Sequence, residues 1–319
     1  MIATSPLLDV RDLTVFFDAG DGRKIHAVSG ISFVVEEGEV LGLVGESGCG
    51  KSSIARALLQ LPRPAAGRVV FEGVDWTRAS CRRLRRLRPR LQMIFQDSVS
   101  ALNPRRRIGD AIAAPLVIMK AGSPKERARR VLKAMHDVGL PEACQRQLPS
   151  VLSGGQCQRA QIARSLIARP KMLICDEPVS SLDVSVRAQI LNLLEDLRRR
   201  YKLAMLFISH DLAVVKNISD RVAVMYLGRL CEVAPAEELY RAPRHPYSRA
   251  LLEAAAQVDT RQPAAPLSLV PGELPSPTDP PKGCRFHARC PVAEKQCSTT
   301  DPRLEEIGSG HVVACHFPL

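Results

Sequence analysis

The sequence has no hydrophobic run long enough to cross a membrane, and it has few aromatic residues. Its apolar stretches fall short of the roughly 18 uninterrupted residues that a membrane-spanning helix needs. Residues 1–6 lack the basic and apolar regions of a secretory signal peptide. Aromatic residues make up only 4% of the 319 residues, so the core must be aliphatic. We therefore expect a cytoplasmic protein that does not itself span a membrane.

Negative charge is also scarce. Asp and Glu together number 33 against 45 Lys and Arg, which leaves a formal net charge of +12. Such a balance is typical of proteins that bind nucleic acid or lie against an anionic membrane surface. A run of arginines contributes to it, but no aromatic residues alternate with them, as they do on surfaces that stack bases. We interpret the run as a solvated helix face, with attraction to anionic lipid as the alternative. It comprises Arg82, Arg83, Arg85, Arg86, Arg88 and Arg90.

Hydrophobic patterning predicts an α/β fold with a mixed sheet. Residues 8–17 and 25–35 alternate between apolar and polar side chains, as antiparallel strands do. Short apolar strands then alternate with helical segments, which is typical of a mostly parallel sheet with helices on its faces. A helical insert over about residues 97–168 would form a subdomain, in which one helix begins near 123–126 and stops at 139–141. The other predicted strands are 40–44, 91–95, 171–175, 204–209 and 221–226, and the other predicted helices are 52–61 and 185–200.

A Gly-rich string of eight residues, Gly45–Ser52, fits the phosphate-binding loop of nucleotide triphosphatases. It stands between a predicted strand and a predicted helix, which is the context that such a loop requires. Backbone N–H groups of residues 47–53 would surround the phosphates at the N-terminus of the helix. Lys51 would reach the β- and γ-phosphates, and Ser52 would bind Mg²⁺. The predicted ATP-binding residues here are Gly45, Glu46, Ser47, Gly48, Cys49, Gly50, Lys51, Ser52 and Ser53.

Polar residues end three other predicted strands. Asp176 follows an apolar strand at the position where a Mg²⁺ ligand belongs, and Glu177 could polarise the attacking water as a general base. His210 follows another apolar run and could point a donor at the γ-phosphate. Gln96 ends a third strand and could sense the metal or the water. Each signal is weak alone, but this set in this order predicts an ATP-hydrolysing site.

The string Leu152–Gln156, which reads Leu-Ser-Gly-Gly-Gln, narrows this class further. Together with the motifs described above, this string makes residues from about 8 to 256 resemble the ATP-binding subunit of an ABC transporter. The family's motifs stand here in order: Walker A Gly45–Ser52, Q-loop Gln96, signature Leu152–Gln156, Walker B Met172–Asp176, catalytic Glu177, D-loop Ser181–Asp183 and switch His210.

The resemblance implies a head-to-tail pair of subunits, in which each ATP lies between the phosphate loop of one and the signature of the other. Phe17 would stack on adenine, although Phe16 is adjacent. Cys157 departs from the basic or amide residue that usually follows the signature. The implied contacts to the partner's ATP come from Ser153, Gly154, Gly155, Gln156 and Asp183, and the implied Mg²⁺ ligands are Ser52, Gln96 and Asp176.

Four of the ten cysteines lie within the last 36 residues, beyond a segment over 257–283 that contains seven prolines. We expect residues 1–256 to form the nucleotide-binding domain and residues 257–319 to form a linker and a cysteine-rich extension. Disulfides are not expected in a reducing cytosol, so the cluster indicates a metal centre. Its chemistry suits either zinc or a [4Fe–4S] cluster, and free thiols are the third possibility. The cysteines are Cys284, Cys290, Cys297 and Cys315.

This tail resembles the C-terminal extension of ATPase subunits from bacterial oligopeptide/dipeptide importers, some of which carry an iron–sulfur cluster. The stretch 98–107 resembles the second of the two unlike ATPases that such systems often encode. The resemblance implies an ATPase that powers peptide import from the cytoplasmic face of the membrane. Its partners would be a second ATPase subunit (unlike or identical), two membrane-spanning permease subunits and, indirectly, an extracytoplasmic solute-binding protein.

Three alternatives stay open at this point. Nickel importers share much of the same pattern, so the solute could be nickel or another solute. A soluble ABC ATPase that acts on nucleic acid or ribosomes would generally need two fused cassettes or long coiled coils, and the sequence has neither. A nucleotide-binding module without catalysis is disfavoured because Lys51, Asp176, Glu177 and His210 are all present. No nucleic-acid partner is therefore expected.

Overall fold

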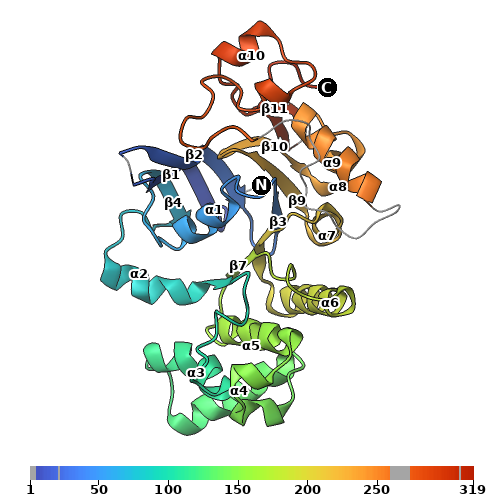
Figure 1. Ribbon diagram of the computed structural model, residues 1–319. Coiled ribbons are helices and arrows are strands. Elements are labelled where there is room, and N and C mark those ends of the chain that lie inside the picture. Colours follow the sequence, from blue (N-terminus) through green and yellow to red (C-terminus); the bar gives the residue numbers. More distant parts are fainter. Residues whose placement is uncertain (1–4, 21, 259–273, 309) are drawn as a thin grey trace. The chain divides into compact units, whose positions relative to one another are not determined.

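The computed structural model describes residues 5–20, 22–258, 274–308 and 310–319. It divides into two compact units, one of residues 1–78 with 207–319 and one of residues 79–206. Figure 1 shows their elements in chain order, from the blue strands near the N-terminus to the red C-terminal extension. Among the described residues, no helix is long and apolar enough to cross a membrane.

The first unit contains an antiparallel sheet in the order β2-β1-β4-β5. The alternating segments predicted at 8–17 and 25–35 are its strands β1 (Leu8–Asp18) and β2 (Lys24–Val35). Strands β4 (Ala66–Phe71) and β5 (Val74–Asp75) were not predicted, because the first half of β4 is exposed and β5 has only two residues. Trp76 follows β5, is fully buried, and packs edge-on against the Phe71 ring at 5.4 Å.

A second sheet of this unit carries strands in the order β11-β12-β10-β9-β3. Strands β3 (Val40–Val44) and β9 (Arg221–Tyr226) are parallel and lie where the apolar runs predicted them. The hairpin partner β10 (Arg229–Pro235) was not predicted. Helix α1 (Lys51–Leu58) ends before the predicted residue 61, because Gln60 turns into the left-handed region at φ 58°. Helices α7 (Leu212–Ile218), α8 (Ala236–Arg241) and α9 (Pro246–Val258) also belong to this unit.

The C-terminal extension is part of the first unit and joins its sheet. Strand β12 (His311–Val313) pairs antiparallel with β10, and β11 (Glu305–Gly308) pairs with β12. The other regular elements of the described extension are a 3₁₀ turn, η4 (His287–Arg289), and a short helix, α10 (Lys295–Thr299). Residues 259–273 of the predicted linker lie outside the described residues. Residues 274–283 contain no helix or strand, as the prolines indicated, and the Pro277 carbonyl accepts from the N–H of His26.

Helices make up most of the second unit, as expected. Ser123 caps α4 (Pro124–Asp137) by accepting from the N–H of Glu126, and Gly139 follows the helix at φ 64°. The arginine run lies on α2 (Cys81–Leu87) and the turn η1 (Arg88–Arg90), where Leu84 is the one buried residue, which fits a solvated helix face. Strands β6 (Leu91–Ile94) and β7 (Met172–Asp176) pair in parallel. The other elements are α3 (Ile108–Ile118), η2 (Glu142–Arg146), η3 (Pro149–Val151), α5 (Gly154–Leu166) and α6 (Val184–Tyr201), and β8 (Ala204–Ile208) leads the chain out of the unit.

Candidate functional site

The Gly-rich string forms a tight loop between β3 and α1 in the first unit. Gly45 has φ 154° and Gly50 has φ 110°, so both adopt backbone conformations that favour glycine. A Cβ on Gly45 would lie 2.1 Å from the Met225 carbonyl oxygen, and one on Gly50 would lie 2.0 Å from that of Ala27. Ser47 and Gly48 are exposed at the tip of the loop. The loop is therefore packed against the sheet on one side and open to a ligand on the other.

Lys51 opens helix α1 and folds back over this loop. Its side chain is buried, and its Nζ donates to the carbonyl oxygens of Gly45 at 2.7 Å and Glu46 at 2.9 Å. Ser52 and Ser53 follow in the first turn of the helix, where backbone N–H groups and the helix dipole favour an anion. The predicted residues of the phosphate loop therefore lie together between β3 and α1, with Lys51 folded over the loop.

Cys49 lies inside the loop rather than on its ligand face. It is 1% exposed, and burial raises the pKa of its thiol, so it stays neutral at physiological pH. Its Sγ lies 3.7 Å from the Lys51 Nζ. Cys49 thus packs the loop and does not offer a thiolate to a ligand.

Glu46 is held by residues distant in sequence that the sequence analysis missed. Its carboxylate accepts from Arg289 Nη1 at 3.0 Å and from Nη2 at 3.1 Å, and its N–H donates to the Tyr247 hydroxyl at 3.0 Å. One signal could have predicted such a partner: a carboxylate inside an anion-binding loop needs a cation beside it. The contacts span 243 and 201 residues of sequence, so no local pattern gives the identity of the partner.

The two adjacent phenylalanines of β1 have different environments. The Phe16 ring packs edge-on against His26 at 4.8 Å and lies under the Lys24 ammonium. Phe17 is 36% exposed. Phe17 is therefore the more accessible of the two rings, and its stacking on a nucleotide base stays a prediction.

His210 is exposed just after β8, in the same unit as the phosphate loop. The N–H of the preceding Ser209 donates to the carbonyl of Leu43 in β3, the strand that leads into the loop. Asp211 caps α7 by accepting from the N–H of Val214 at 3.1 Å. Hydrogen bonds thus fix both ends of the turn that carries His210, and His210 itself is exposed.

In the second unit, Gln96 and Glu177 lie together. The Gln96 Nε2 donates to the Glu177 Oε2 at 2.9 Å, across 81 residues of sequence. Asp176 is the last residue of β7 and is 3% exposed. Because β6 and β7 are parallel, Gln96 and Glu177 both follow the carboxyl ends of their strands at the same edge of the sheet. The sequence analysis placed Gln96 and Glu177 after predicted strands, but it did not predict the hydrogen bond between them.

The signature string forms the N-terminus of α5. Ser153 is the N-cap and accepts from the N–H of Gln156, and the Gln156 side chain accepts from the N–H of Ser153 at 3.0 Å. This reciprocal pair is a capping box, so both residues have a structural role that the sequence analysis did not predict. Ser153 and Gly154 are exposed. A Cβ on Gly155 would lie 2.7 Å from a methyl of Val186 on α6, so this glycine also permits close helix packing.

Cys157 and Asp183 flank this region in different ways. Cys157 is fully buried, with its Sγ 3.6 Å from the Pro149 carbonyl oxygen. The unusual residue therefore fills the interior of the unit and leaves the exposed signature unchanged. Asp183 is the exposed N-cap of α6 without a side-chain cap bond, and the following Val184 is 81% exposed.

The four tail cysteines all line one small cavity of the extension, together with Phe286 and His316. Burial raises the pKa of the Cys284 thiol to about 11. Among the described residues, however, no three or more His, Cys, Asp or Glu side chains are grouped in a way that could hold a metal ion. The structure thus supports neither the predicted iron–sulfur cluster nor zinc.

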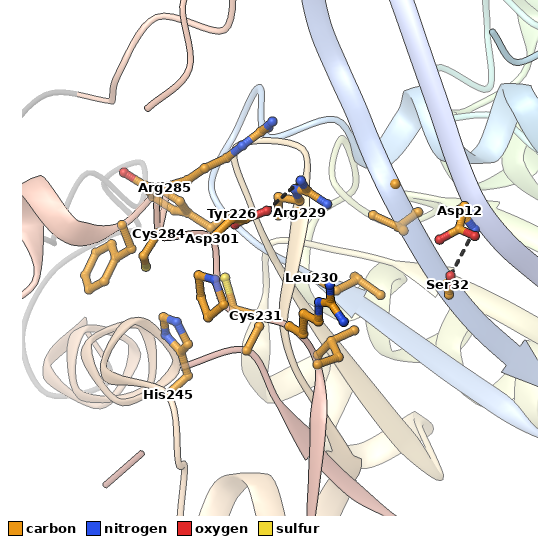
Figure 2. A pocket seen from close by; sticks show the side chains of 17 residues that line it. Asp12, Ser32, Tyr226, Arg229, Leu230, Cys231, His245, Cys284, Arg285 and Asp301 are labelled. Atoms are coloured by element: carbon orange, nitrogen blue, oxygen red, sulfur yellow. Dashed lines mark hydrogen bonds and ion pairs between the residues drawn. The ribbon is translucent and has the colours of Figure 1, made fainter. Parts of the chain in front are cut away.

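A larger cavity of about 600 Å³ lies between the extension and the strands of the first unit. Figure 2 shows Asp12 and Ser32 on one side of it, with Cys284 and Arg285 of the extension on the other. Arg229 of β10 pairs with Asp301 of the extension at 2.6 Å, and Arg285 donates to the Leu227 carbonyl. These contacts attach the extension to the sheet that supports the phosphate loop.

Comparison with protein families gives two matches. Residues 28–180 match the ABC transporter family, and residues 231–297 match the oligopeptide/dipeptide transporter C-terminal region. The chain is 46% identical over 316 residues to the di/tripeptide transport ATP-binding protein DppF of Pseudomonas aeruginosa, with 97% of each chain covered. It is 46% identical over 320 residues to the oligopeptide transport ATP-binding protein OppF of Salmonella typhimurium, covering 97% of this chain and 95% of that one.

Solved structures of single cassettes are also similar. The ATP-binding cassette MJ0796, in a dimeric post-hydrolysis state bound to ADP and Pi, superposes with a TM-score of 0.66 at 25% identity. The match covers 72% of this chain and 98% of that chain. CbiO1 of Clostridium perfringens, part of an ABC transporter complex, gives a TM-score of 0.65 at 28% identity, over 74% of this chain and 91% of that chain.

Proposed function

Because the chain belongs to the ABC transporter family of ATP-binding proteins, we propose that it is the ATPase subunit of a peptide importer. The observation that carries the proposal is the open phosphate loop, with Lys51 held against its carbonyl groups. Support also comes from relatives named for di/tripeptide and oligopeptide transport, which match over nearly the whole chain.

Binding of ATP would exchange the contacts of Lys51. The Lys51 ammonium would leave the carbonyl oxygens of Gly45 and Glu46 and bind the phosphates instead. The N–H groups of the loop would surround the phosphates. Phe17 would stack on the adenine, since its ring is exposed. Oxygen donors suit Mg²⁺, so Ser52, Gln96 and Asp176 would hold the ion, which neutralises charge on the β- and γ-phosphates.

Hydrolysis would depend on Glu177 as the general base. Its carboxylate is already oriented by the Gln96 amide at 2.9 Å, and in that orientation it would take a proton from a water bound beside it. His210 would donate to the γ-phosphate from its fixed turn. Charge stabilisation by the loop and Lys51 would supply most of the remaining rate enhancement.

The second half of each ATP site would come from another ABC ATPase subunit. Ser153, Gly154, Gly155 and Gln156 form a helix N-terminus at which Ser153 and Gly154 are exposed, and such a terminus favours an anion such as the partner's γ-phosphate. Asp183 and Val184 are exposed beside it and would lie in the same interface. An unlike sister subunit is our preferred partner, with a homodimer as the alternative. A dimeric arrangement of the similar cassette MJ0796 agrees with such pairing.

The exposed apolar residues of the second unit are candidates for contact with two membrane-spanning permease subunits. Ile118 at the end of α3 is 71% exposed, and Val117 beside it is 53% exposed. Val99, in the segment after Gln96, is 52% exposed. Such a surface would place the protein peripherally at the cytoplasmic face of the membrane. An extracytoplasmic solute-binding protein would deliver peptides to the permease subunits from the opposite face.

Trapping of ATP by Glu177→Gln tests the ATPase proposal. We expect the variant, purified with its partner subunit, to bind ATP normally and to form a stable pair with hydrolysis reduced at least a hundredfold. Gln96→Glu is the matched control, because it places like charges beside Glu177 and should disturb the same contact without trapping. Normal hydrolysis by Glu177→Gln would contradict the assignment of the base.

Uptake by whole cells tests the solute. A strain that lacks this chain should lose uptake of labelled di- and oligopeptides, and the wild-type chain should restore it while Lys51→Ala should not. Uptake of labelled nickel by the same strains tests the alternative that the chain serves a nickel importer. Loss of nickel uptake with normal peptide uptake would overturn peptide import.

For the extension, we assign the four tail cysteines to a [4Fe–4S] cluster, with zinc and free thiols as alternatives. The proposal rests on the chemistry of the donor set, because four cysteines suit such a cluster. Cys284, Cys290, Cys297 and Cys315 line one cavity, but among the described residues they are not grouped as metal ligands. Anaerobically purified protein should then be brown and contain about four iron atoms per chain. Colourless protein with stoichiometric zinc, or with neither metal, would contradict the cluster.

A further inference from the structure

The C-terminal extension reaches the phosphate loop through one buried ion pair. Arg289 lies in η4, and its two terminal nitrogens contact the two carboxylate oxygens of Glu46 at 3.0 and 3.1 Å. The side chains of Arg289 and Glu46 are 5% and 9% exposed. A bidentate pair with this burial has a defined geometry, unlike a pair on the surface.

Arg289 is itself held in place. The Tyr226 hydroxyl accepts from it at 3.2 Å, and its guanidinium lies 5.7 Å from the centre of the Tyr226 ring. Phe286, three residues earlier in the chain, packs against Tyr226 and Tyr247 at 5.3 and 5.2 Å. Burial opposes the charge of Arg289, but its bonds to Glu46 outweigh this and raise its pKa. Arg289 is therefore a fixed cation.

Glu46 places a negative charge inside a loop whose ligand is a polyanion. Its N–H is already used by the Tyr247 hydroxyl, and its carbonyl accepts from Lys51 and from the N–H of Cys49. The carboxylate is buried, so water screens it poorly and repulsion of a bound phosphate would be strong without a counter-charge. Arg289 supplies that counter-charge and directs the carboxylate toward the extension.

We propose that Arg289 is a positioning residue for ATP binding, through which the extension holds and neutralises the second residue of the phosphate loop. The proposal rests on the proposed function, since it takes Gly45–Ser52 to be the ATP site. It gives the extension a direct role in nucleotide affinity. ATP carries more negative charge than ADP, so loss of Arg289 should weaken ATP binding more than ADP binding.

A double-mutant cycle on the full-length chain tests this role. The variants are Arg289→Gln, Glu46→Gln and the two combined, and the measurements are the Kd values for ATP and ADP together with the melting temperature. We expect Arg289→Gln to raise the Kd for ATP about tenfold, or about 1.4 kcal/mol, and the Kd for ADP by less. The combined variant, which has neither charge, should return to within about threefold of the wild type.

Two outcomes would overturn the proposal. The first is wild-type ATP affinity in Arg289→Gln. The second is a combined variant that binds ATP as weakly as Arg289→Gln does, because Arg289 would then act only by keeping the extension folded. If Arg289→Gln fails to fold, Arg289→Lys replaces it, because it keeps the charge but loses the two-pronged contact. Near-normal ATP affinity of Arg289→Lys supports the role of charge, and a tenfold loss contradicts it.

The failure of this inference can be distinguished from failure of the proposed function. Wild-type protein that does not bind ATP at all, in the presence of Mg²⁺, would contradict the ATP site itself. Wild-type protein that binds ATP, with affinity lost in Lys51→Ala and unchanged in all the Arg289 and Glu46 variants, would contradict the role of Arg289 alone.

Discussion

The phosphate loop and the signature turn, which we propose as the two anion sites of this chain, are stabilised in different ways. The phosphate loop is held by distant residues: the carbonyls of Ala27 and Met225 lie against its glycines, and Tyr247 and Arg289 hold Glu46. The backbone N–H groups of the signature turn are bonded locally, through the capping box between Ser153 and Gln156. A loop supported from a distance can respond to changes elsewhere in the fold, whereas a turn that caps itself depends on its own short segment.

Of the substitutions that test this difference, Gly50→Ala in the phosphate loop should lower the stability of the chain most. A Cβ there would meet the Ala27 carbonyl oxygen at 2.0 Å on a backbone of φ 110°, so strain and overpacking should cost about 2 to 5 kcal/mol of stability. Denaturant unfolding with and without ATP measures both stability and binding. Gly48→Ala is the matched control, because its Cβ would have no neighbour within 4 Å and only its φ of 79° is unfavourable. Equal stability losses in the two variants would contradict the distant support.

A second prediction concerns pH and the residues that anchor the extension. His245 is 2% exposed, its Nδ1 accepts from the N–H of Tyr247, and burial lowers its pKa to about 4. In the unfolded chain, His245 has an ordinary pKa near 6.5. Between pH 6.5 and 4, His245 is therefore protonated in the unfolded chain and neutral in the folded chain. Stability should therefore fall as pH drops from about 6.5 to 4, by roughly 3 kcal/mol from this group.

His245→Asn isolates that contribution. Its side-chain oxygen can accept from the Tyr247 N–H as Nδ1 does, but it does not titrate. The difference in unfolding free energy between wild type and variant should vary with pH only inside this window. A difference that stays constant from pH 7 to 4 would show that His245 is not kept neutral by burial.

How far the sequence predicted these features follows from the same contrast. The loop Gly45–Ser52, the strand end at Asp176 and the cap at Ser123 depend on residues close together in sequence, and the structure has them as expected. The strand predicted to end at Gln96 is also present, but it ends at Ile94. Arg289 contacts Glu46 across 243 residues of sequence. Strand β12 pairs with β10, although α8 and α9 lie between the two strands in the sequence. Such contacts are fixed by tertiary packing, so spacing within a segment does not predict them. The capping box was missed for another reason: the signature was interpreted for its ligand and not for its local bonds.

The smallest expected effect on stability, and the sharpest test of the signature turn, comes from Ser153. Ser153→Ala removes the N-cap and should cost about 1 kcal/mol. Ser153→Asp keeps a good N-cap, so its unfolding free energy should stay within about 0.5 kcal/mol of wild type. The added charge, however, would face the partner's γ-phosphate and should block ATP-driven pairing. Unfolding and sedimentation with ATP separate the two roles. If Ser153→Asp pairs and hydrolyses ATP normally, the turn is only a helix cap, and the chain's second anion site has to lie elsewhere.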